Sequence, residues 1–546
     1  MNKIFLSLIT IFLTTIISDA QILHNDLKTT RADSLRGGLR AERTSYDVKY
    51  YHLDIKINPE EKSIAGYNQI TFRVVEPTSR IQIDLFDNLK IDSIKLDGEL
   101  LKYTREFNAV FIDLPSEYTI NEVKSLYFYY SGKPTIAKKA PWDGGFVFDK
   151  TPSGDHFIAV ACQGFGASSW WPNKDHQSDE PDSMLISIAI PEGLKNISNG
   201  RFRGVDSLAN GYNRWNWFVS NPINNYDVTV NIADYVHFSD TYKDLDLDYW
   251  VLPENLEKAK VQFEEVKPMM QCFEEKMGFY PFKEDGYKLV ETPYLGMEHQ
   301  SAVAYGNKYL KGYLGHDLSG SGVGLKWDFI IIHETGHEWY GNSITSSDIA
   351  DMWIHEGFTQ YTEVIYTECR WGYEDAMTYI NGLKRNVQND IPIIGPYGVN
   401  KEGSGDMYPK GALFLNTLRH VVNNDDLWWK TFKSYTLDHK KSIVNTVIVQ
   451  SYFEEKLNMD LEPLFNQYLR TTDIPVLEWK KNGKKYEYRW TRVVDGFNMP
   501  VDVIIGNENK RLTPTTTWQK LKLDDNDVNI DVATGQFYIF TKEAAN

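Results

Sequence analysis

The sequence predicts a multidomain α+β protein with an N-terminal antiparallel β domain, a helix-rich α+β domain and a small C-terminal β-sandwich. Residues 45–235 contain runs in which apolar and polar residues alternate, the period of a half-buried strand. Residues 236–472 place apolar residues at helical spacing, and residues 473–546 return to strand-like runs. A chain of 546 residues is long enough for three such domains.

Two segments precede the predicted β domain. Residues 1–20 have the pattern of a secretory signal, with Lys3 at the start, an apolar stretch over residues 4–17 and the small residue Ala20 at the end. Export to the periplasm or the medium is therefore expected. The apolar stretch is short for a membrane span, so no stable membrane anchor is expected. Residues 21–44 are polar and charged with little periodicity, and a loose leader is expected there.

Strands and helices can be placed along the three domains. Leu53, Ile55 and Ile57 alternate with polar residues as in a half-buried strand. Further strand-like runs cover residues 67–75, 81–86, 125–130 and 184–190. Helices are expected over residues 253–277, 376–387 and 411–422, over about 356–370, and from residue 329 to a C-cap at Gly341. After Pro475, Asn482-Gly483 between two strand-like runs predicts a hairpin.

Composition excludes some classes of function. The net charge is −17, from 58 basic and 75 acidic residues, which argues against a nucleic-acid partner. Three cysteines, none in a Cys-x-x-Cys pair, predict neither a disulfide scaffold nor a second zinc site. No oligomeric state is predicted.

The strongest chemical signal is His333-Glu334-Thr335-Gly336-His337, followed 19 positions later by Glu356. Histidines at i and i+4 lie on one face of a helix, so both rings can bind one zinc ion, and a later carboxylate can supply a third ligand. Three protein ligands leave one position for water, and Glu334 is placed to take a proton from that water. The alternative is a surface helix that carries two histidines by chance.

Two further residues, Tyr408 and Glu298, are candidates for functional roles, and each also has a purely structural interpretation. Tyr408 opens a predicted helix and could donate to an oxyanion, but from spacing alone it is one of 33 tyrosines. Glu298 follows a glycine-containing extended segment that could lie beside a peptide backbone, and its carboxylate could bind a charged amino terminus. Its alternative is a solvated surface carboxylate.

The combination of these motifs resembles the M1 family of zinc aminopeptidases, which are gluzincins. Gly296-Met297-Glu298, the HExxH motif, Glu356 and Tyr408-Pro409-Lys410-Gly411 occur in the family's order and at comparable spacing. The resemblance covers almost the whole mature chain, including residues 51–59, which resemble the family's opening strand. It implies a thermolysin-like fold for residues 236–472.

The resemblance implies roles for the residues that match the family's metal and catalytic positions. His333, His337 and Glu356 match the ligands of one zinc ion per chain. Glu334 matches the general base, and Tyr408 matches the tyrosine that stabilises the oxyanion.

A second group of matches concerns the substrate. Glu298 matches the glutamate that binds the α-amine, and Gly296 and Met297 belong to the same substrate-binding segment. Gln163 matches a residue that lines the first substrate pocket and helps to hold the amine. Glu363 is expected to contact a ligand histidine from behind.

The resemblance therefore implies a zinc-dependent aminopeptidase that uses a zinc-activated water to remove the N-terminal residue from peptides with a free amino terminus. A thermolysin-like endopeptidase remains an alternative, although it would have no use for Glu298. A relative that hydrolyses a lipid epoxide is another. A catalytically inactive peptide-binding relative is the third, although such proteins usually lose a ligand or the base.

The sequence departs from the family pattern at four neighbouring positions. Leu295 and His299 stand where the family's Gly-x-Met-Glu-Asn motif has Gly and Asn. The family's preference for the N-terminal residue of the substrate therefore cannot be assigned to this chain. His355 and Glu338 stand where Asn and Gln are common, and both are expected to add ionisable groups that shift the pH optimum.

The chain is also shorter than many family members. About 76 residues follow Arg470, which predicts a short form without the large helical C-terminal domain. A more open substrate cleft is expected from this difference.

Overall fold

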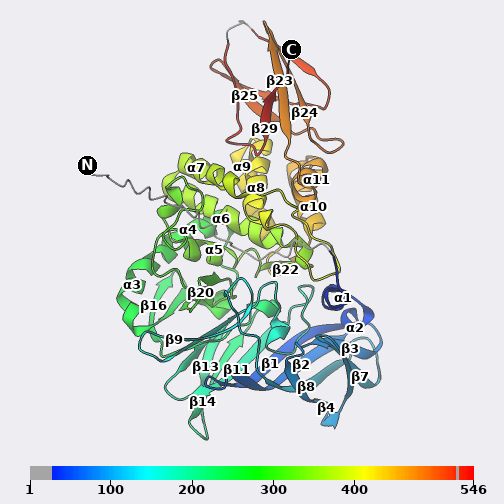
Figure 1. Cartoon of the computed structure of the whole chain (residues 1–546), viewed down its shortest axis with the longest axis vertical. Helices are drawn as coiled ribbons and strands as arrows, with labels where there is room; N and C mark the ends of the chain where they lie inside the picture. The colour runs from blue at the N-terminus through cyan, green and yellow to red at the C-terminus, as the bar shows by residue number, and fades with distance from the viewer. Residues whose placement is uncertain (1–27, 524–527, 546) are drawn as a thin grey trace, which may run out of the picture.

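The structure, a computed structural model, describes residues 28–523 and 528–545. The predicted signal peptide and residues 21–27 of the predicted leader lie outside the described residues. Large sheets occupy one end of the elongated molecule, helices fill its middle, and small sheets from the C-terminal residues form the other end (Figure 1). This arrangement is the expected mixture of helices and several sheets, whereas the exact domain boundaries stay predictions.

An eight-stranded sheet dominates residues 45–235. Its spatial order is β13 (Arg201–Leu208), β14 (Tyr212–Val219), β11 (Ser183–Pro191), β1 (Tyr46–Asn58), β2 (Ser63–Val74), β8 (Val123–Gly132), β4 (Leu89–Leu96) and β5 (Glu99–Leu100). Leu53, Ile55 and Ile57 of β1 are at most 1% exposed, which confirms the alternation seen in the sequence.

The expectation of a purely antiparallel domain is wrong at the centre of this sheet. β1 and β11 pair in parallel, with Leu53 opposite Ile186. Parallel neighbours require a long connection, and residues 59–182 supply it. A local pattern of apolar residues reports which face of a strand is buried, and it carries no information on strand direction.

Two smaller sheets complete this part of the chain. The first contains β12 (Lys195–Ile197), β15 (Asn231–Ala233), β10 (His156–Ala161) and β9 (Gly145–Lys150). The second contains β3 (Thr78–Asp84), β7 (Ala109–Tyr118) and β6 (Lys102–Glu106). β10 leads directly to Gln163, one of the predicted substrate-binding residues.

The described part of the predicted leader is ordered rather than loose. It forms two short helices, α1 (Arg31–Gly37) and α2 (Ala41–Thr44). Thr30 and Asp33 form a reciprocal capping box at the start of α1. Arg43 is fully buried and forms an ion pair of 2.5 Å with Asp84. The leader has no periodic apolar pattern, because its contacts are this ion pair and the packing of one apolar residue, Leu35, against Ala109 and Phe111.

A mixed sheet and nine helices form the middle of the described chain. The sheet contains β16 (Val236–Tyr242), β17 (Leu245–Val251), β18 (Tyr287–Glu291), β20 (Val303–Tyr305) and β19 (Gly296–Met297). The helices are α3 (Leu256–Gln262), α4 (Val266–Met277), α5 (Phe329–Gly336), α6 (Trp353–Trp371), α7 (Tyr373–Leu383), α8 (Pro409–Val422), α9 (Asp425–Asp438), α10 (Thr446–Leu457) and α11 (Glu462–Arg470). A short parallel pair joins β21 (Ile344–Ser346) to β22 (Ser442–Val444).

A disulfide between Cys272 and Cys369 links α4 to α6. The cysteine count did not predict this bridge, because the two residues are 97 positions apart and belong to no recognisable spacing pattern. The third cysteine, Cys162, is free and buried. The bridge joins two helices of the same core that surrounds α5.

Two small sheets follow α11. One contains β27 (Gln519–Lys522), β24 (Lys485–Thr491), β23 (Val476–Asn482) and β29 (Phe540–Glu543), and the other contains β26 (Glu508–Leu512), β25 (Val501–Ile505) and β28 (Ile530–Val532). β23 and β24 form the predicted hairpin, with Asn482 opposite Lys485. Buried residues of these sheets share one hydrophobic core with the helices, and the Tyr468 hydroxyl of α11 donates to the Tyr538 carbonyl at 2.9 Å.

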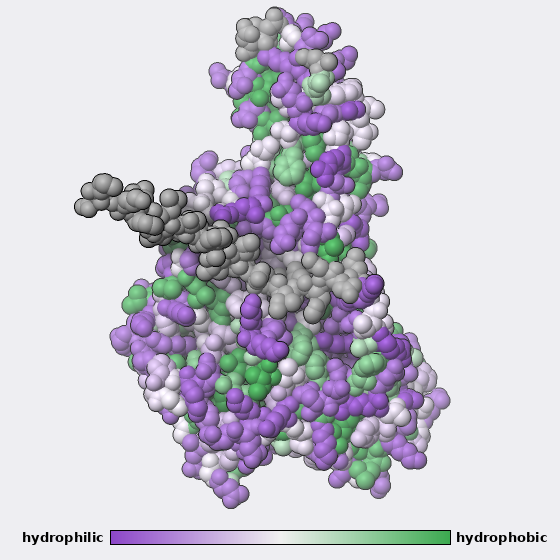
Figure 2. Space-filling model, viewed as in Figure 1, coloured by the Kyte–Doolittle hydropathy of each residue, from purple (hydrophilic) through white to green (hydrophobic). Residues whose placement is uncertain are grey.

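The surface is mainly polar on the face shown in Figure 2, where apolar side chains lie in small scattered groups. Within residues 28–523 and 528–545, the structure contains no helix that is both long and apolar enough to cross a bilayer.

Candidate active site

The HExxH helix α5 begins at a buried N-cap. Asp328 is fully buried, and its carboxylate accepts hydrogen bonds from the backbone amides of Ile330 at 3.0 Å and Ile331 at 3.3 Å. The side chains of Gln262, Tyr305 and Asn307 also donate to it, at 2.6 to 2.8 Å. Burial nevertheless raises the pKa of the Asp328 carboxyl to about 6. The cap fixes where the helix starts, and therefore where His333 and His337 point.

The α5 helix ends earlier than predicted. It stops at Gly336, and His337 occupies the C-cap position with helical dihedral angles. Gly341, the predicted C-cap, lies beyond the helix with a φ of +121° and donates its amide to Ile344. The i and i+4 relationship of the two histidines survives, because His337 keeps helical geometry.

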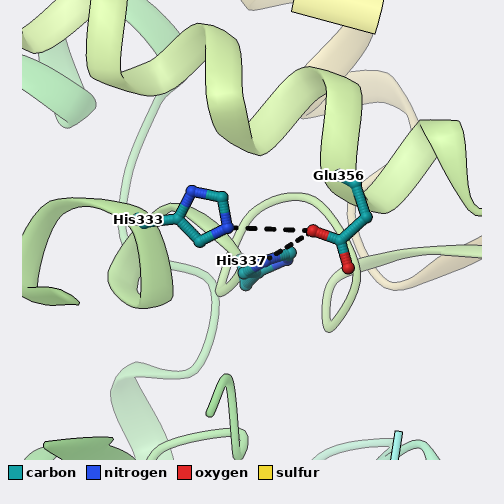
Figure 3. A group of neighbouring side chains, drawn as sticks. All are labelled: His333, His337 and Glu356. Carbon is teal, nitrogen blue, oxygen red and sulfur yellow. Dashed lines mark ion pairs between the residues drawn. The ribbon is translucent and has the colours of Figure 1, made fainter. Parts of the chain in front are cut away.

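Three predicted metal ligands meet in one buried cluster. His333 and His337 come from α5 and its C-cap, and Glu356 comes from the first turn of α6 (Figure 3). Oε2 of Glu356 lies 3.7 Å from Nε2 of His333 and 3.3 Å from Nε2 of His337. One potential ligand atom from each residue lies within 4.8 Å of the others.

Hydrogen bonds behind the two rings determine which nitrogens face the cluster. Nδ1 of His333 donates to Oε1 of Glu363 at 2.7 Å, because a carboxylate can only accept. Nδ1 of His337 donates to the backbone carbonyl of Tyr340 at 3.0 Å for the same reason. In neutral rings the two Nε2 atoms therefore carry lone pairs that point toward Glu356.

These donor atoms fit a divalent metal. Two ring lone pairs converge on Oε2 of Glu356, which is buried and accepts no hydrogen bond from any residue that the structure describes. Acceptors that face one another at this distance repel unless a cation lies between them. Two imidazoles and one carboxylate form the ligand set typical of a catalytic zinc site, in which one position remains open.

Glu334 lies between the ligand cluster and the predicted substrate segment. A Cβ atom on Gly296 would lie 2.7 Å from Oε1 of Glu334 and 2.9 Å from a methyl carbon of Ile330. Only glycine allows β19 to pass so close to α5. Burial raises the pKa of the Glu334 carboxyl, and His333 and His337 counteract part of that rise. A buried carboxyl of raised pKa suits a group that must take up and release a proton.

Glu298 follows β19 and is only 2% exposed. Its backbone carbonyl accepts a hydrogen bond of 2.8 Å from the Asn342 side chain. One carboxylate oxygen lies within 4.8 Å of a ligand atom of both Glu334 and His337. Burial raises the pKa of Glu298 to about 8, and a positive group bound beside it would lower that pKa again. The site therefore holds a buried carboxyl group directly after β19, and a cation bound beside it would favour its charged form.

Gln163, Met297 and Tyr408 complete the predicted set. The Gln163 side chain donates to Oε1 of Glu356 at 2.6 Å, so the structure places it on a ligand, and its predicted contact with the substrate amine stays a prediction. Met297 is buried in β19, opposite Ala304. The Tyr408 ring stacks on His333 with centroids 6.1 Å apart, and burial raises the pKa of its hydroxyl well above the usual range. Tyr408 thus keeps its proton and can donate it in a hydrogen bond.

Burial shifts the pKa values of His355 and Glu338 in opposite directions, and the expected change in the pH optimum stays a prediction. Burial lowers the pKa of His355 to about 3, so this ring is uncharged at neutral pH and adds no ionisation there. Burial raises the pKa of Glu338 to about 8, and its carboxyl accepts the Ser301 amide at 2.7 Å. Both side chains face the protein interior and have structural hydrogen bonds.

Sequence reasoning missed two groups that contact the site from behind. The Tyr340 carbonyl orients His337. Every residue has a backbone carbonyl, so the residue type at position 340 does not predict this contact. The Tyr226 hydroxyl lies 3.2 Å from Nδ1 of His355. The only sequence signal for Tyr226 would have been an aromatic residue just before a buried strand-like run, which is common in this chain.

Comparisons with known proteins show what this chain is similar to. Residues 261–468 match the model of the peptidase family M1 domain. The chain is 24% identical over 318 residues to glutamyl aminopeptidase from Bos taurus, which covers 55% of this chain and 33% of the relative. It is 20% identical to leucyl aminopeptidase from Saccharolobus solfataricus, over 80% of this chain and 55% of the relative. It is also 20% identical to leukotriene A-4 hydrolase from Xenopus laevis, over 81% of this chain and 74% of the relative.

Solved structures show the same fold. An M1 zinc metallopeptidase mutant from Deinococcus radiodurans, bound to a Tyr-Ser-Ala substrate, superposes with a TM-score of 0.65 at 18% identity. The match covers 79% of this chain and 95% of that one. Residues 261–468 therefore contain a domain of peptidase family M1. It spans about a third to a little over half of the two aminopeptidases named above.

Proposed function

We propose that this protein is a zinc-dependent aminopeptidase that removes the N-terminal residue from peptides. The observation that carries the proposal is the position of Glu298, whose buried carboxylate lies within 4.8 Å of both Glu334 and His337. A hydrolytic site of this ligand type needs no such group. An aminopeptidase site needs such a carboxylate, because binding the charged amino terminus determines which peptide bond reaches the reacting groups.

Different residues of the site are assigned to metal binding, proton transfer and stabilisation of the oxyanion. A zinc ion held by His333, His337 and Glu356 would polarise the scissile carbonyl and lower the pKa of a bound water. Glu334 takes the proton of the attacking water and delivers it to the leaving amine. The Tyr408 hydroxyl, which keeps its proton, donates a hydrogen bond to the oxyanion of the tetrahedral intermediate.

Substrate binding depends on Glu298 and on the strand before it. An ammonium group beside Glu298 forms a charge-assisted hydrogen bond in a site from which water is excluded. The short strand β19 gives the substrate backbone an extended partner to lie along. The Gln163 side chain donates to Oε1 of Glu356 at 2.6 Å, and this position beside a metal ligand supports the proposal that Gln163 contacts the first residue of the substrate.

Export is proposed together with this activity. The signal pattern of residues 1–20 supports it. The disulfide between Cys272 and Cys369 also supports it, because such bridges persist in oxidising compartments and are rare in a reducing cytosol.

The other functions considered make different demands on the site. A thermolysin-like endopeptidase gains nothing from a buried Glu298 beside the catalytic residues. An inactive peptide-binding relative would have no need for Glu334, the three ligands and Tyr408 together. Similarity to leukotriene A-4 hydrolase leaves lipid epoxides as a second substrate class to assay, although no described residue argues for it.

Metal removal and restoration test the proposal. The purified protein should contain one zinc ion per chain and should cleave aminoacyl-aminocoumarin substrates. A chelator should abolish cleavage, and added zinc should restore it. Full activity after removal of the metal would refute the zinc-dependent mechanism. Zinc bound at one ion per chain with no cleavage of any free-amine peptide would favour the inactive relative.

A further inference from the structure

We propose that Glu402 determines which N-terminal residues this site accepts, by binding the positively charged side chain of an arginine or a lysine at the first position of the peptide. The carboxylate forms a charge-assisted hydrogen bond with the guanidinium or ammonium group of that side chain. This inference rests on the proposed aminopeptidase function and names a substrate class for the same site. The motif pattern of the sequence assigns no role to Glu402.

The carboxylate of Glu402 contacts the turn that carries Gln163. A Cβ atom on Gly164 would lie 2.7 Å from Oε1 of Glu402, so only glycine leaves room for the carboxylate there. Gly164 also has a φ of +66°, which favours glycine. The residue before it, Gln163, donates to Oε1 of the metal ligand Glu356 at 2.6 Å. Glu402 therefore touches the residue next to a side chain that contacts a metal ligand.

The loop that contains Glu402 is anchored beside the metal ligands. It leads to Tyr408, whose ring stacks on His333 with centroids 6.1 Å apart. The helix α8 that follows packs so closely on α6 that a Cβ atom on Gly411 would lie 2.8 Å from Cα of Gly357. Glu402 thus belongs to a segment that is fixed against the helix of a metal ligand.

Glu402 borders a space that a substrate side chain can enter. Gly403 and Ser404, which follow it, are buried, whereas Glu402 itself is half-buried. Gln163 and Gly164 on the facing turn are also half-buried. Because the Glu402 carboxylate touches Gly164, the accessible parts of these residues adjoin one another. This position suits the side chain of the residue whose amine and carbonyl are held at the metal site.

The Glu402 carboxylate has no partner within the protein. Among the residues that the structure describes, none donates a hydrogen bond to it or forms an ion pair with it. The neighbouring guanidinium of Arg36 pairs instead with Asp175, at 3.6 Å. An unpaired, half-buried carboxylate is costly beside an apolar side chain and favourable beside a cationic one. Burial also raises the pKa of Glu402 to about 7, and a bound cation would lower it again.

Neutral analogues of the basic residues separate charge from size. Citrulline has nearly the shape of arginine without its charge, and norleucine has the carbon chain of lysine without the ammonium group. Glu402→Gln likewise keeps the shape of the side chain and removes its charge. A preference that depends on the Glu402 charge should therefore disappear when either partner is neutral.

The experiment compares kcat/KM for arginyl- and citrullyl-aminocoumarin, and for lysyl- and norleucyl-aminocoumarin, with zinc-loaded protein. The native protein should prefer the charged member of at least one pair by about 10- to 100-fold, as expected for a hydrogen bond between charged groups. Glu402→Gln should reduce that preference to within about three-fold, because only the charged substrate loses a partner. Glu374→Gln, which changes an exposed carboxylate on α7, is the matched control and should keep the native preference.

A binding assay separates recognition of the side chain from loss of structure. In a Glu334→Gln background, zinc-loaded protein is titrated with argininamide and with citrullinamide. Adding Glu402→Gln should weaken argininamide at least about ten-fold and citrullinamide by less than about two-fold.

Three results would count against the inference. A native protein that cleaves free-amine substrates without preferring either charged residue over its neutral analogue would overturn the role of Glu402 and leave the proposed function intact. Equal losses on charged and neutral substrates in Glu402→Gln would also overturn it, because they indicate a structural role. A native protein that cleaves no free-amine substrate would overturn the proposed function and this inference together.

Discussion

Glu363 of α6 accepts a hydrogen bond of 2.7 Å from Nδ1 of His333, and both side chains are buried. The contact fixes the tautomer of His333, so that Nε2 faces Glu356 with its lone pair. It also ties α5 to α6, the two helices that supply the metal ligands. The Tyr379 hydroxyl donates a hydrogen bond of 2.6 Å to Oε2 of Glu363, and this second contact keeps the carboxylate from rotating away from His333.

Replacement of Glu363 should therefore weaken metal binding without removing a ligand. We expect Glu363→Ala to lower zinc affinity about 10- to 100-fold, because His333 loses its orientation and part of its basicity. Competition with a chromogenic chelator measures the affinity. The control variant Glu274→Gln, which changes a partly buried carboxylate on α4 that pairs with Lys243, should retain native affinity. Native affinity in Glu363→Ala would contradict the role of the hydrogen bond.

Substitutions of Glu334 and Tyr408 should lower kcat without lowering the zinc content of the protein. Glu334→Gln should keep about one zinc per chain and lower kcat by about 10² to 10⁴, as expected for the loss of a general base. Tyr408→Phe should lower kcat about 10² to 10³ with little change in KM, because the hydrogen bond to the oxyanion forms only as the tetrahedral intermediate forms. Metal analysis and steady-state kinetics check both variants. A fall in zinc content that accounts for the lost activity would contradict these assignments.

His299 should make folding stability depend on pH. It is fully buried, neither ring nitrogen has a partner among the described residues, and burial lowers its pKa to about 3. The unfolded chain takes up a proton on this ring below pH 6.5, whereas the folded protein does so only near pH 3. Stability is therefore present above pH 6.5 and is lost as the pH falls toward 3.

The effect of His299 can be isolated with one substitution. Between pH 7.5 and pH 5, the free energy of unfolding of the native protein should fall by about 2 kcal/mol more than that of His299→Asn. Urea unfolding at the two pH values gives both differences, and all other titrating groups cancel. Equal losses in the two proteins would show that His299 titrates normally in the folded state.

The helix α1 should stabilise the loop that leads toward Tyr408. A Cβ atom on Gly37 would lie 2.1 Å from the carbonyl carbon of Val399, and the Asn400 amide donates to the Asp33 carbonyl at 3.1 Å. Gly37→Ala should force these backbones apart and cost about 1–3 kcal/mol of unfolding free energy. Ser34→Ala in the same helix should change it by no more than about 0.5 kcal/mol. Identical unfolding midpoints for the two variants would contradict the close contact.

The sequence predicted those features that depend on local pattern or on a dense motif. Alternation identified the strand through Leu53, Ile55 and Ile57 because one face of β1 is buried. The HExxH motif and Glu356 were found because their chemistry requires fixed residue types at fixed spacing, and the structure brings all three ligands together.

The features that were missed depend on contacts between distant segments. The parallel pairing of β1 with β11 and the bridge from Cys272 to Cys369 leave no local signal. The ordered leader depends on the buried ion pair of Arg43 with Asp84. The contact of the Tyr226 hydroxyl with Nδ1 of His355 likewise joins residues that are 129 positions apart.

The central claim is that Glu298 binds the amino terminus of the substrate and thereby restricts cleavage to the first peptide bond. The most direct measurement is the ratio of kcat/KM for leucyl-aminocoumarin to that for its N-acetylated form, in the native protein and in Glu298→Ala. We expect a ratio of at least about 10³ in the native protein, which falls strongly in Glu298→Ala because only the free-amine substrate loses its anchor. Comparable cleavage of both substrates by the native protein, or equal losses on both in Glu298→Ala, would contradict the account.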